Sequence, residues 1–160
     1  TALNMDVGTM LRLAEVPNIV GVKEASSDAD QIAFVIKDSL EGFRVWSGND
    51  NETFATMATG GYGIVSVAGN IISGQVQKMM GLLLEGDVEA AAAEHLRLLP
   101  IFNALFIITN PIPVRYAINR SGFDVGPARL PMIPESAELE SFSTRFDPIM
   151  DQYAIDLSEA

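Results

Sequence analysis

Two kinds of hydrophobic pattern follow one another along the first hundred residues. Short runs rich in β-branched and aromatic residues are followed by small polar residues, and between them apolar positions recur every three or four residues. The first pattern predicts strands and the second predicts helices with one buried face. We expect strands at 19–22, 43–47 and 64–68, and helices at 5–15, 28–39, 52–59, 71–84 and 86–106.

Strands that alternate with helices through short connections indicate a parallel α/β fold with right-handed crossovers. A (β/α)8 barrel and an open doubly wound sheet both fit this order. No G-x-G-x-x-G motif follows a strand, so the sequence does not support a dinucleotide-binding fold. In a barrel the active site lies at the carboxyl ends of the strands, where all three strands deliver small polar residues. We therefore expect these three polar ends to share one mouth.

The first strand lies in PNIVGVKEASS and delivers a lysine, Lys23, at its carboxyl end. Residues alternate between the two faces of a strand, so Lys23 shares a face with Ile19 and Gly21. We expect a strand that is buried on both sides. Desolvation there would lower the pKa of Lys23 from about 10.4 toward neutrality, and a neutral amine can attack a ketone to form a Schiff base. The alternative is an ordinary surface lysine with a partly buried stem.

Composition narrows the possible functions. The 160 residues are 48% hydrophobic, which is enough for a core of one-domain size. The chain has no cysteine, which excludes disulfides, thiolate metal sites and a cysteine nucleophile. A net charge of −11 argues against nucleic acid or an anionic membrane as partner. We see no run of about 20 apolar residues and no signal peptide, and expect a cytoplasmic protein. Because the chain starts at Thr1, we expect a processed or partial chain.

Several other residues could carry chemistry but have simpler interpretations. We expect Glu24 to form a structural ion pair and His95 to be a partly exposed helix residue. The carboxylates near Asp50 lack a histidine partner, so we expect no metal there and expect Asp50 to cap the helix that follows. Pro111 and Pro113 predict an extended break between two helices.

Five motifs stand in a fixed order along the chain: GVKEASSD, WSGND, GGYGIVSVAGN, NPIPVRYA and RLPMIP. Together they resemble the C-terminal half of the enzymes of the dihydrodipicolinate synthase/N-acetylneuraminate lyase family, which are pyruvate-dependent class I aldolases. The resemblance runs from Thr1 to about Pro134. NPIPVRYA and RLPMIP resemble the synthase branch more than the sialic-acid and keto-sugar aldolases. The sequence departs from that branch at Arg115, where the synthases more often carry lysine.

The resemblance implies a fold and partners. Residues 1–85 would be the C-terminal part of a (β/α)8 TIM barrel, with its last three strands, and residues 86–160 a C-terminal helical domain. The N-terminal half of the same barrel would be a necessary partner, supplying hydroxyl, tyrosine and arginine groups. A homo-oligomer, tetramer or dimer, is also implied, without nucleic acid or membrane.

The resemblance also implies a site and a reaction. Lys23 would form the imine with pyruvate, Gly48 and Val65 would line the pyruvate pocket partly through their backbones, and Asn110 would lie nearby. No cofactor or metal is implied. The lyase of the synthase branch condenses pyruvate with aspartate semialdehyde to 4-hydroxy-tetrahydrodipicolinate, on the route to diaminopimelate and lysine. Alternatives are another aldolase of the family, acting on a 2-keto-3-deoxy sugar acid or N-acetylneuraminate, and a non-catalytic keto-acid-binding relative.

Overall fold

The structure, a computed structural model, describes residues 3–132, 136–153 and 155. The chain divides into two compact units, which are considered separately. The first unit comprises Thr1–Ser66 and Met79–Ala92, and the second comprises Val67–Lys78 and Ala93–Ala160. The boundary that we expect between residues 85 and 86 falls between the helices α4 (Gly69–Leu84) and α5 (Val88–Ala104), and it stays a prediction.

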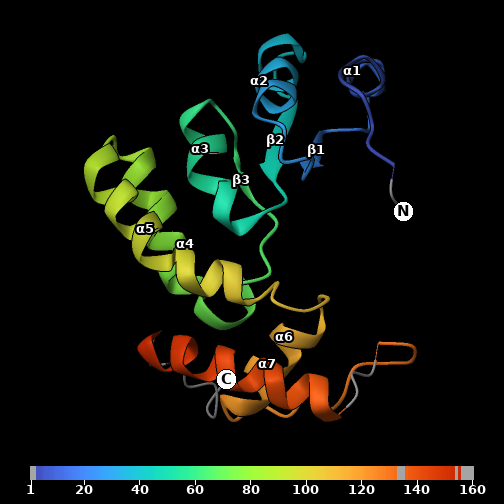
Figure 1. Cartoon of the computed structure of the whole chain (residues 1–160). Helices are drawn as coiled ribbons and strands as arrows, with labels where there is room; N and C mark the ends of the chain where they lie inside the picture. Colours follow the sequence, from blue (N-terminus) through green and yellow to red (C-terminus); the bar gives the residue numbers. More distant parts are fainter. Residues whose placement is uncertain (1–2, 133–135, 154, 156–160) are drawn as a thin grey trace. The chain divides into compact units, whose positions relative to one another are not determined.

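The first unit contains a three-stranded parallel sheet in the order β1-β2-β3 (Figure 1). The strands are β1 (Gly21–Glu24), β2 (Arg44–Ser47) and β3 (Gly63–Ile64). This confirms the predicted parallel α/β arrangement.

The strand boundaries differ from the prediction at both edges of the sheet. Ile19 and Val20 precede β1, and the Val20 side chain is 68% exposed. The predicted strand at 64–68 is reduced to two residues, although the amide of Val65 still donates to the carbonyl of Ser47 at 2.9 Å. Both are edge strands among the described residues, and a strand extends only as far as a neighbouring strand pairs with it.

Two of the helices in the first unit begin at aspartate caps. The first helical elements along the chain are α1 (Val7–Ala14), α2 (Ala29–Asp38), the 3-10 turn η1 (Asp50–Glu52) and α3 (Thr53–Ala58). The Asp6 carboxylate accepts from the Thr9 amide at 2.8 Å, and the Asp28 carboxylate accepts from the Asp30 and Gln31 amides, both at 3.0 Å. These bonds satisfy amides that have no partner within the helix.

The core of this unit lies between the sheet and two helices. Met10 of α1, Val35 of α2 and Val45 of β2 are its buried centre. On the same face of the sheet, Glu24 and Ser47 are 3% and 1% exposed. The opposite face, which carries the Lys23–Trp46 pair of the register, is less buried, since Trp46 is half-buried and Lys23 is exposed. One face of the sheet is thus covered by helices and the other presents Lys23.

The remaining helices are α4 (Gly69–Leu84), α5 (Val88–Ala104), α6 (Ile112–Arg120) and α7 (Ser136–Met150), with the 3-10 turn η2 (Asp151–Tyr153) at the end. The helices predicted at 71–84 and 86–106 are confirmed with slightly shifted ends. The predicted extended break at Pro111–Pro113 is wrong, because Pro113 lies in the first turn of α6. A proline there sacrifices no hydrogen bond, since the first amides of a helix have no acceptor within it.

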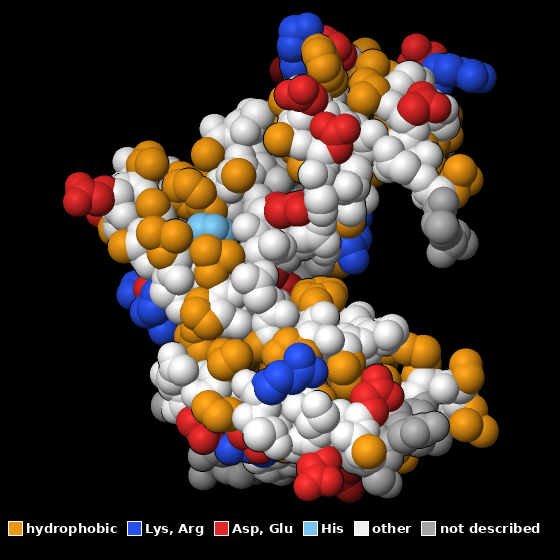
Figure 2. All heavy atoms as spheres, in the orientation of Figure 1, with side chains coloured by type: hydrophobic (Ala, Val, Ile, Leu, Met, Phe, Trp, Pro, Cys, Tyr) orange, Lys and Arg blue, Asp and Glu red, His pale blue; other side chains and the backbone are white. Residues whose placement is uncertain are grey.

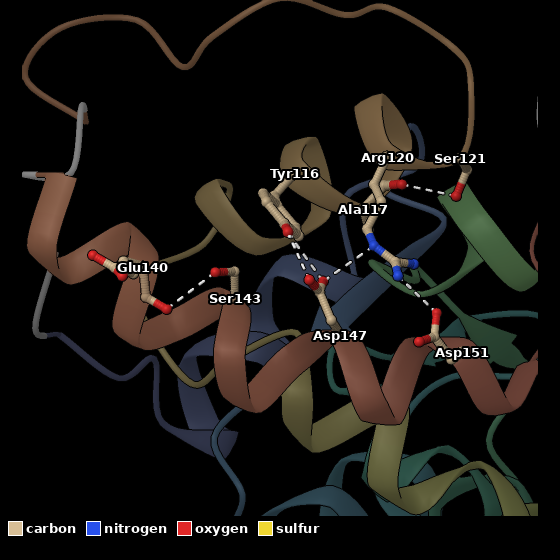
Figure 3. Close-up of polar contacts among 8 residues, drawn as sticks. All are labelled: Tyr116, Ala117, Arg120, Ser121, Glu140, Ser143, Asp147 and Asp151. Atoms are coloured by element: carbon tan, nitrogen blue, oxygen red, sulfur yellow. Dashed lines mark hydrogen bonds and ion pairs between the residues drawn. The ribbon is translucent and has the colours of Figure 1, made fainter.

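In the second unit, α6 and α7 are joined by aromatic packing and by polar contacts, and Figure 3 shows the polar contacts. The Tyr116 ring meets the Phe142 and Phe146 rings edge-on, with centroids 5.3 and 6.0 Å apart. The Tyr116 hydroxyl donates to the Asp147 carboxylate at 3.0 Å, and Arg120 Nε lies 3.2 Å from the same carboxylate. Aromatic packing and charge therefore hold the same two helices together.

Hydrophobic side chains are exposed over α4 and α5 on the face shown in Figure 2. Leu84, Val88 and Leu96 are each more than half exposed. No helix among the described residues is both long enough and apolar enough to span a membrane.

Candidate active site

Lys23 lies in β1, opposite Trp46 of β2 in the register, and Trp46 in turn lies opposite Gly63 of β3. The three residues therefore form one row on the face of the sheet that the helices of the first unit leave open. The Lys23 side chain is exposed. This differs from the expected desolvation, because we predicted a strand buried on both sides and the described helices of the first unit cover only one side of it.

Gly48 follows β2 and is brought against Lys23. The Gly48 amide donates to the Glu24 carbonyl at 2.6 Å, which extends the ladder past the end of both strands. A methyl group built on Gly48 would lie 2.5 Å from the Ala25 Cβ atom and 3.0 Å from Lys23 Cε. The first distance is too short for two carbon atoms, so only glycine lets the lysine stem and this turn lie together.

Val65 directly follows β3, at the same edge of the sheet as Gly48. Its amide donates to the Ser47 carbonyl at 2.9 Å, and its side chain is 47% exposed. Lys23, Gly48 and Val65 therefore lie at the carboxyl ends of three adjacent parallel strands, where α/β proteins bind their ligands. Their roles as imine-forming and pyruvate-contacting residues stay predictions.

Asn110 belongs to the second unit, where it is exposed in the turn before α6. Further along α6, Arg115 donates through Nη2 to the carbonyls of Val125 and Gly126, the latter at 3.2 Å. Its charge thus fixes the loop that follows α6. The motif RLPMIP lies beyond this loop, and its last two residues, Ile133 and Pro134, are outside the described residues.

Glu24 is buried through hydrogen bonds, which corrects the expected ion pair. Its carboxylate accepts from the Ser26 amide at 2.6 Å and from Gln31 Nε2 at 2.8 Å. The Gln31 amide oxygen in turn accepts from Asn4 Nδ2 at 2.7 Å. Dipolar donors satisfy the buried charge here, and they tie the strand that carries Lys23 to α2 and to the N-terminal segment.

Lys23 also lines a hollow of about 640 Å³. Its walls come from the N-terminal segment, α1 and the end of β1, all in the first unit: Leu3, Asn4, Met5, Met10, Val22, Lys23, Glu24, Ala25, Ser26 and Asp28. Because Met10 and Glu24 belong to the helix-covered side of the sheet, the hollow follows the outer edge of β1 and is not confined to the Lys23 face.

The analysis of the sequence missed side chains that join the loops after the three strands. Asn49 Nδ2 donates to the Ser27 hydroxyl at 3.2 Å, and the Ser66 hydroxyl donates to Asp50 Oδ1. Asp50 was expected to cap the following helix, but it lies in η1, two residues before the N-cap of α3. The available signal was the polar residues after each strand, which we expected to share one mouth but not to bond to one another.

His95 is a half-buried residue of α5, as predicted, and burial lowers its pKa. Within residues 3–132, 136–153 and 155, no group of three or more His, Cys, Asp or Glu side chains could hold a metal ion. That the reaction needs neither metal nor cofactor stays a prediction.

A profile of the dihydrodipicolinate synthetase family matches residues 1–145. The chain belongs to this family. Among similar members of the family is the 4-hydroxy-tetrahydrodipicolinate synthase of Symbiobacterium thermophilum, which is 47% identical over 141 residues, covering 88% of this chain and 48% of that protein. The enzyme of the same name from Dehalococcoides mccartyi (strain CBDB1) is 46% identical over 132 residues, covering 82% of this chain and 44% of that protein.

Solved structures of the dihydrodipicolinate synthetase family share this fold. That of dihydrodipicolinate synthase from Cyanidioschyzon merolae with lysine bound has a TM-score of 0.88 and 37% identity, over 94% of this chain and 50% of that one. The chain therefore spans about half the length of the relatives that it matches.

Proposed function

We propose that these residues are the lysine-bearing half of a Schiff-base lyase that condenses pyruvate with aspartate semialdehyde to 4-hydroxy-tetrahydrodipicolinate. The observation that carries the proposal is the position of Lys23, at the carboxyl end of a parallel strand and directly against the side-chain-free Gly48. The names of the similar relatives support the choice of substrates.

Within the proposal, the three strands are the last three of a closed eight-stranded barrel. The remaining half would pair with the free edges of β1 and β3 and cover the Lys23 row of the sheet. That covering would remove water from Lys23. We place the assembled enzyme in the cytoplasm as a homo-oligomer, dimer or tetramer.

The proposed chemistry uses the Lys23 amine as a nucleophile. Lys23 Nζ attacks the ketone carbon of pyruvate, and loss of water leaves a protonated imine. Loss of a methyl proton gives an enamine, whose carbon attacks the aldehyde of the second substrate. The amine of that substrate then displaces Lys23 Nζ as the product cyclises, which frees the enzyme.

Gly48 and Val65 would contribute shape and backbone groups to the keto-acid pocket. The absence of a side chain at Gly48 leaves space beside the lysine stem, which any larger residue would fill. Asn110 is proposed to contribute from the second unit.

The test is reductive trapping in the full-length protein that contains these residues. Borohydride with pyruvate should add the mass of one reduced pyruvate to the peptide that contains Lys23. Lys37 is a matched internal control, because it is an exposed lysine of the same unit that pairs with Asp38 at 3.0 Å. Labelling of Lys37 with none at Lys23 would contradict the proposal. Labelling of Lys23 without turnover of aspartate semialdehyde would contradict the choice of substrate.

A further inference from the structure

The loops after the three strands are connected to one another by side chains. Ser27, Asn49, Asp50 and Ser66 form what we call the loop bracket. Asn49 Nδ2 donates to Ser27 Oγ at 3.2 Å, which links the loop after β1 to the loop after β2. Ser66 Oγ donates to Asp50 Oδ1, which links the loop after β2 to the residues after β3. All four residues belong to the first unit.

The loop after β2, which contains Asn49 and Asp50, is anchored by buried hydroxyl groups. The Asn49 carbonyl accepts from Ser47 Oγ at 2.8 Å and from Thr53 Oγ1 at 3.0 Å. Ser47 and Thr53 are 1% and 0% exposed, so these two hydroxyls are held by packing. Because the loop after β2 is anchored in this way, its bond to Ser66 also fixes the residues after β3 relative to the end of β2.

Asp50 is an unusual residue to find buried. It is 2% exposed, and a buried carboxylate is costly unless donors surround it. Ser66 supplies one such donor in a charge-assisted bond, which is stronger than a bond between neutral groups. At the other end of the bracket, Ser27 has φ of 61°, a left-handed conformation that a non-glycine residue keeps only when its surroundings enforce it. The burial of Asp50 and the left-handed backbone of Ser27 both need contacts from other segments to be maintained.

We propose that Asp50 and Ser66 are a positioning pair that holds Val65 in register with Gly48 around the keto acid bound at Lys23. This rests on the proposed function. Gly48 lies two residues before Asp50 and Val65 one residue before Ser66, so the bond spans the two proposed pyruvate contacts at their shared edge. Neither residue needs to touch the substrate, because each acts through its neighbour.

The experiment measures the pyruvate dependence of borohydride labelling at Lys23 in the full-length protein. In Ser66→Ala, which removes the donor, we expect the pyruvate concentration for half-maximal labelling to rise about tenfold, with the same final extent of labelling. Ser66→Thr keeps the hydroxyl and should stay within about threefold of the unchanged protein. Ser39→Ala is the matched control. The Ser39 hydroxyl also donates a hydrogen bond, to the Val35 carbonyl at the end of α2, but Ser39 precedes β2 and is not in a loop that follows a strand. This substitution should leave the pyruvate dependence unchanged.

A purely structural role predicts a different result. Ser66→Ala and Ser39→Ala would then lower the temperature of unfolding alike, and the pyruvate dependence would stay unchanged in both. That outcome would overturn the positioning pair. An equal rise in the half-maximal pyruvate concentration in Ser66→Thr and Ser66→Ala would overturn it too. In both cases Lys23 would still be labelled, so the proposed function would stand. Absence of labelling in the unchanged protein would overturn the proposed function and the positioning pair together.

Discussion

Two polar regions of the chain satisfy their charges in different ways. At the α6–α7 contact, Asp147 binds both Tyr116 and Arg120, so its partners come from the same unit (Figure 3). On the open face of the sheet, Lys23 is exposed. The first region is satisfied within its own unit, whereas under the proposed function the second is completed by the other half of the barrel. Stability and chemistry are therefore separated, and substitutions should separate them too.

The largest expected effect is on the open face. Lys23→Ala or Lys23→Arg should abolish pyruvate-dependent labelling and reduce turnover by several orders of magnitude, because neither side chain can form the imine. Unfolding should be almost unchanged, since the backbone pairing of β1 and the hydrogen bonds of Glu24 do not involve the Lys23 side chain. The measurement is steady-state turnover together with thermal unfolding in the full-length protein. Near-normal turnover in Lys23→Ala would remove the central assignment.

The next prediction is that residues 1–160 need the other half of the barrel to fold and to react with pyruvate. Residues 1–160 produced alone should be aggregated or loosely packed and inactive, because β1 and β3 have unpaired edges and the Lys23 face is uncovered. Mixed with the remaining half of the barrel, they should form a compact oligomer and regain labelling at Lys23. Sedimentation and borohydride labelling of each half and of the mixture provide the measurement. A monomeric, cooperatively unfolding and labelled 160-residue species would show that the open face is complete after all.

At the α6–α7 contact, the expected effect is on stability alone. Phe146 is 0% exposed, so Phe146→Ala should lower the free energy of unfolding by about 3 to 5 kcal/mol. Phe34→Ala is the matched control, because Phe34 is 51% exposed and the same truncation there should cost much less. Denaturant unfolding of the full-length protein measures both. Equal losses from the two substitutions would show that α7 is not packed as described.

The smallest effect is a dependence on pH. Burial, and then the hydrogen bond to Asp147, raise the pKa of Tyr116 above its usual value of 10.0. The folded state therefore favours the protonated hydroxyl, and this contribution to stability is present below pH 10 and lost as the pH rises through the raised pKa. Tyr116→Phe should make unfolding less sensitive to pH in this alkaline range. An unchanged alkaline profile in Tyr116→Phe would show that another group is responsible.

Features set by nearby residues could be predicted from the sequence. Asp6 and Asp28 mark helix starts because the cap and the amides that it satisfies lie within three residues. The parallel order of the strands followed from their alternation with helices, and the motif around Lys23 indicated the family. These signals do not depend on how distant segments pair.

Features set by distant pairing could not be predicted. The lengths of β1 and β3 depend on which strands pair with their outer edges, and the burial of Lys23 depends on which segment packs over its face of the sheet. Glu24 was expected to meet a cation, but Gln31, seven residues away, satisfies it. Asp50 was interpreted as a cap because its partner, Ser66, lies 16 residues further along the chain. In each case the sequence shows the polar group but not the segment that packs against it.

Trp46 gives the open face an optical signal of its own. It is the one tryptophan of the 160 residues, it is half-buried, and it lies directly opposite Lys23 in the register of the sheet. The Trp46 indole is partly exposed to solvent, and any segment that covers the Lys23 row would shield it from water. Its fluorescence should then shift to shorter wavelength and become less accessible to quenchers such as iodide. Emission from Trp46 should therefore report whether a segment covers the Lys23 row.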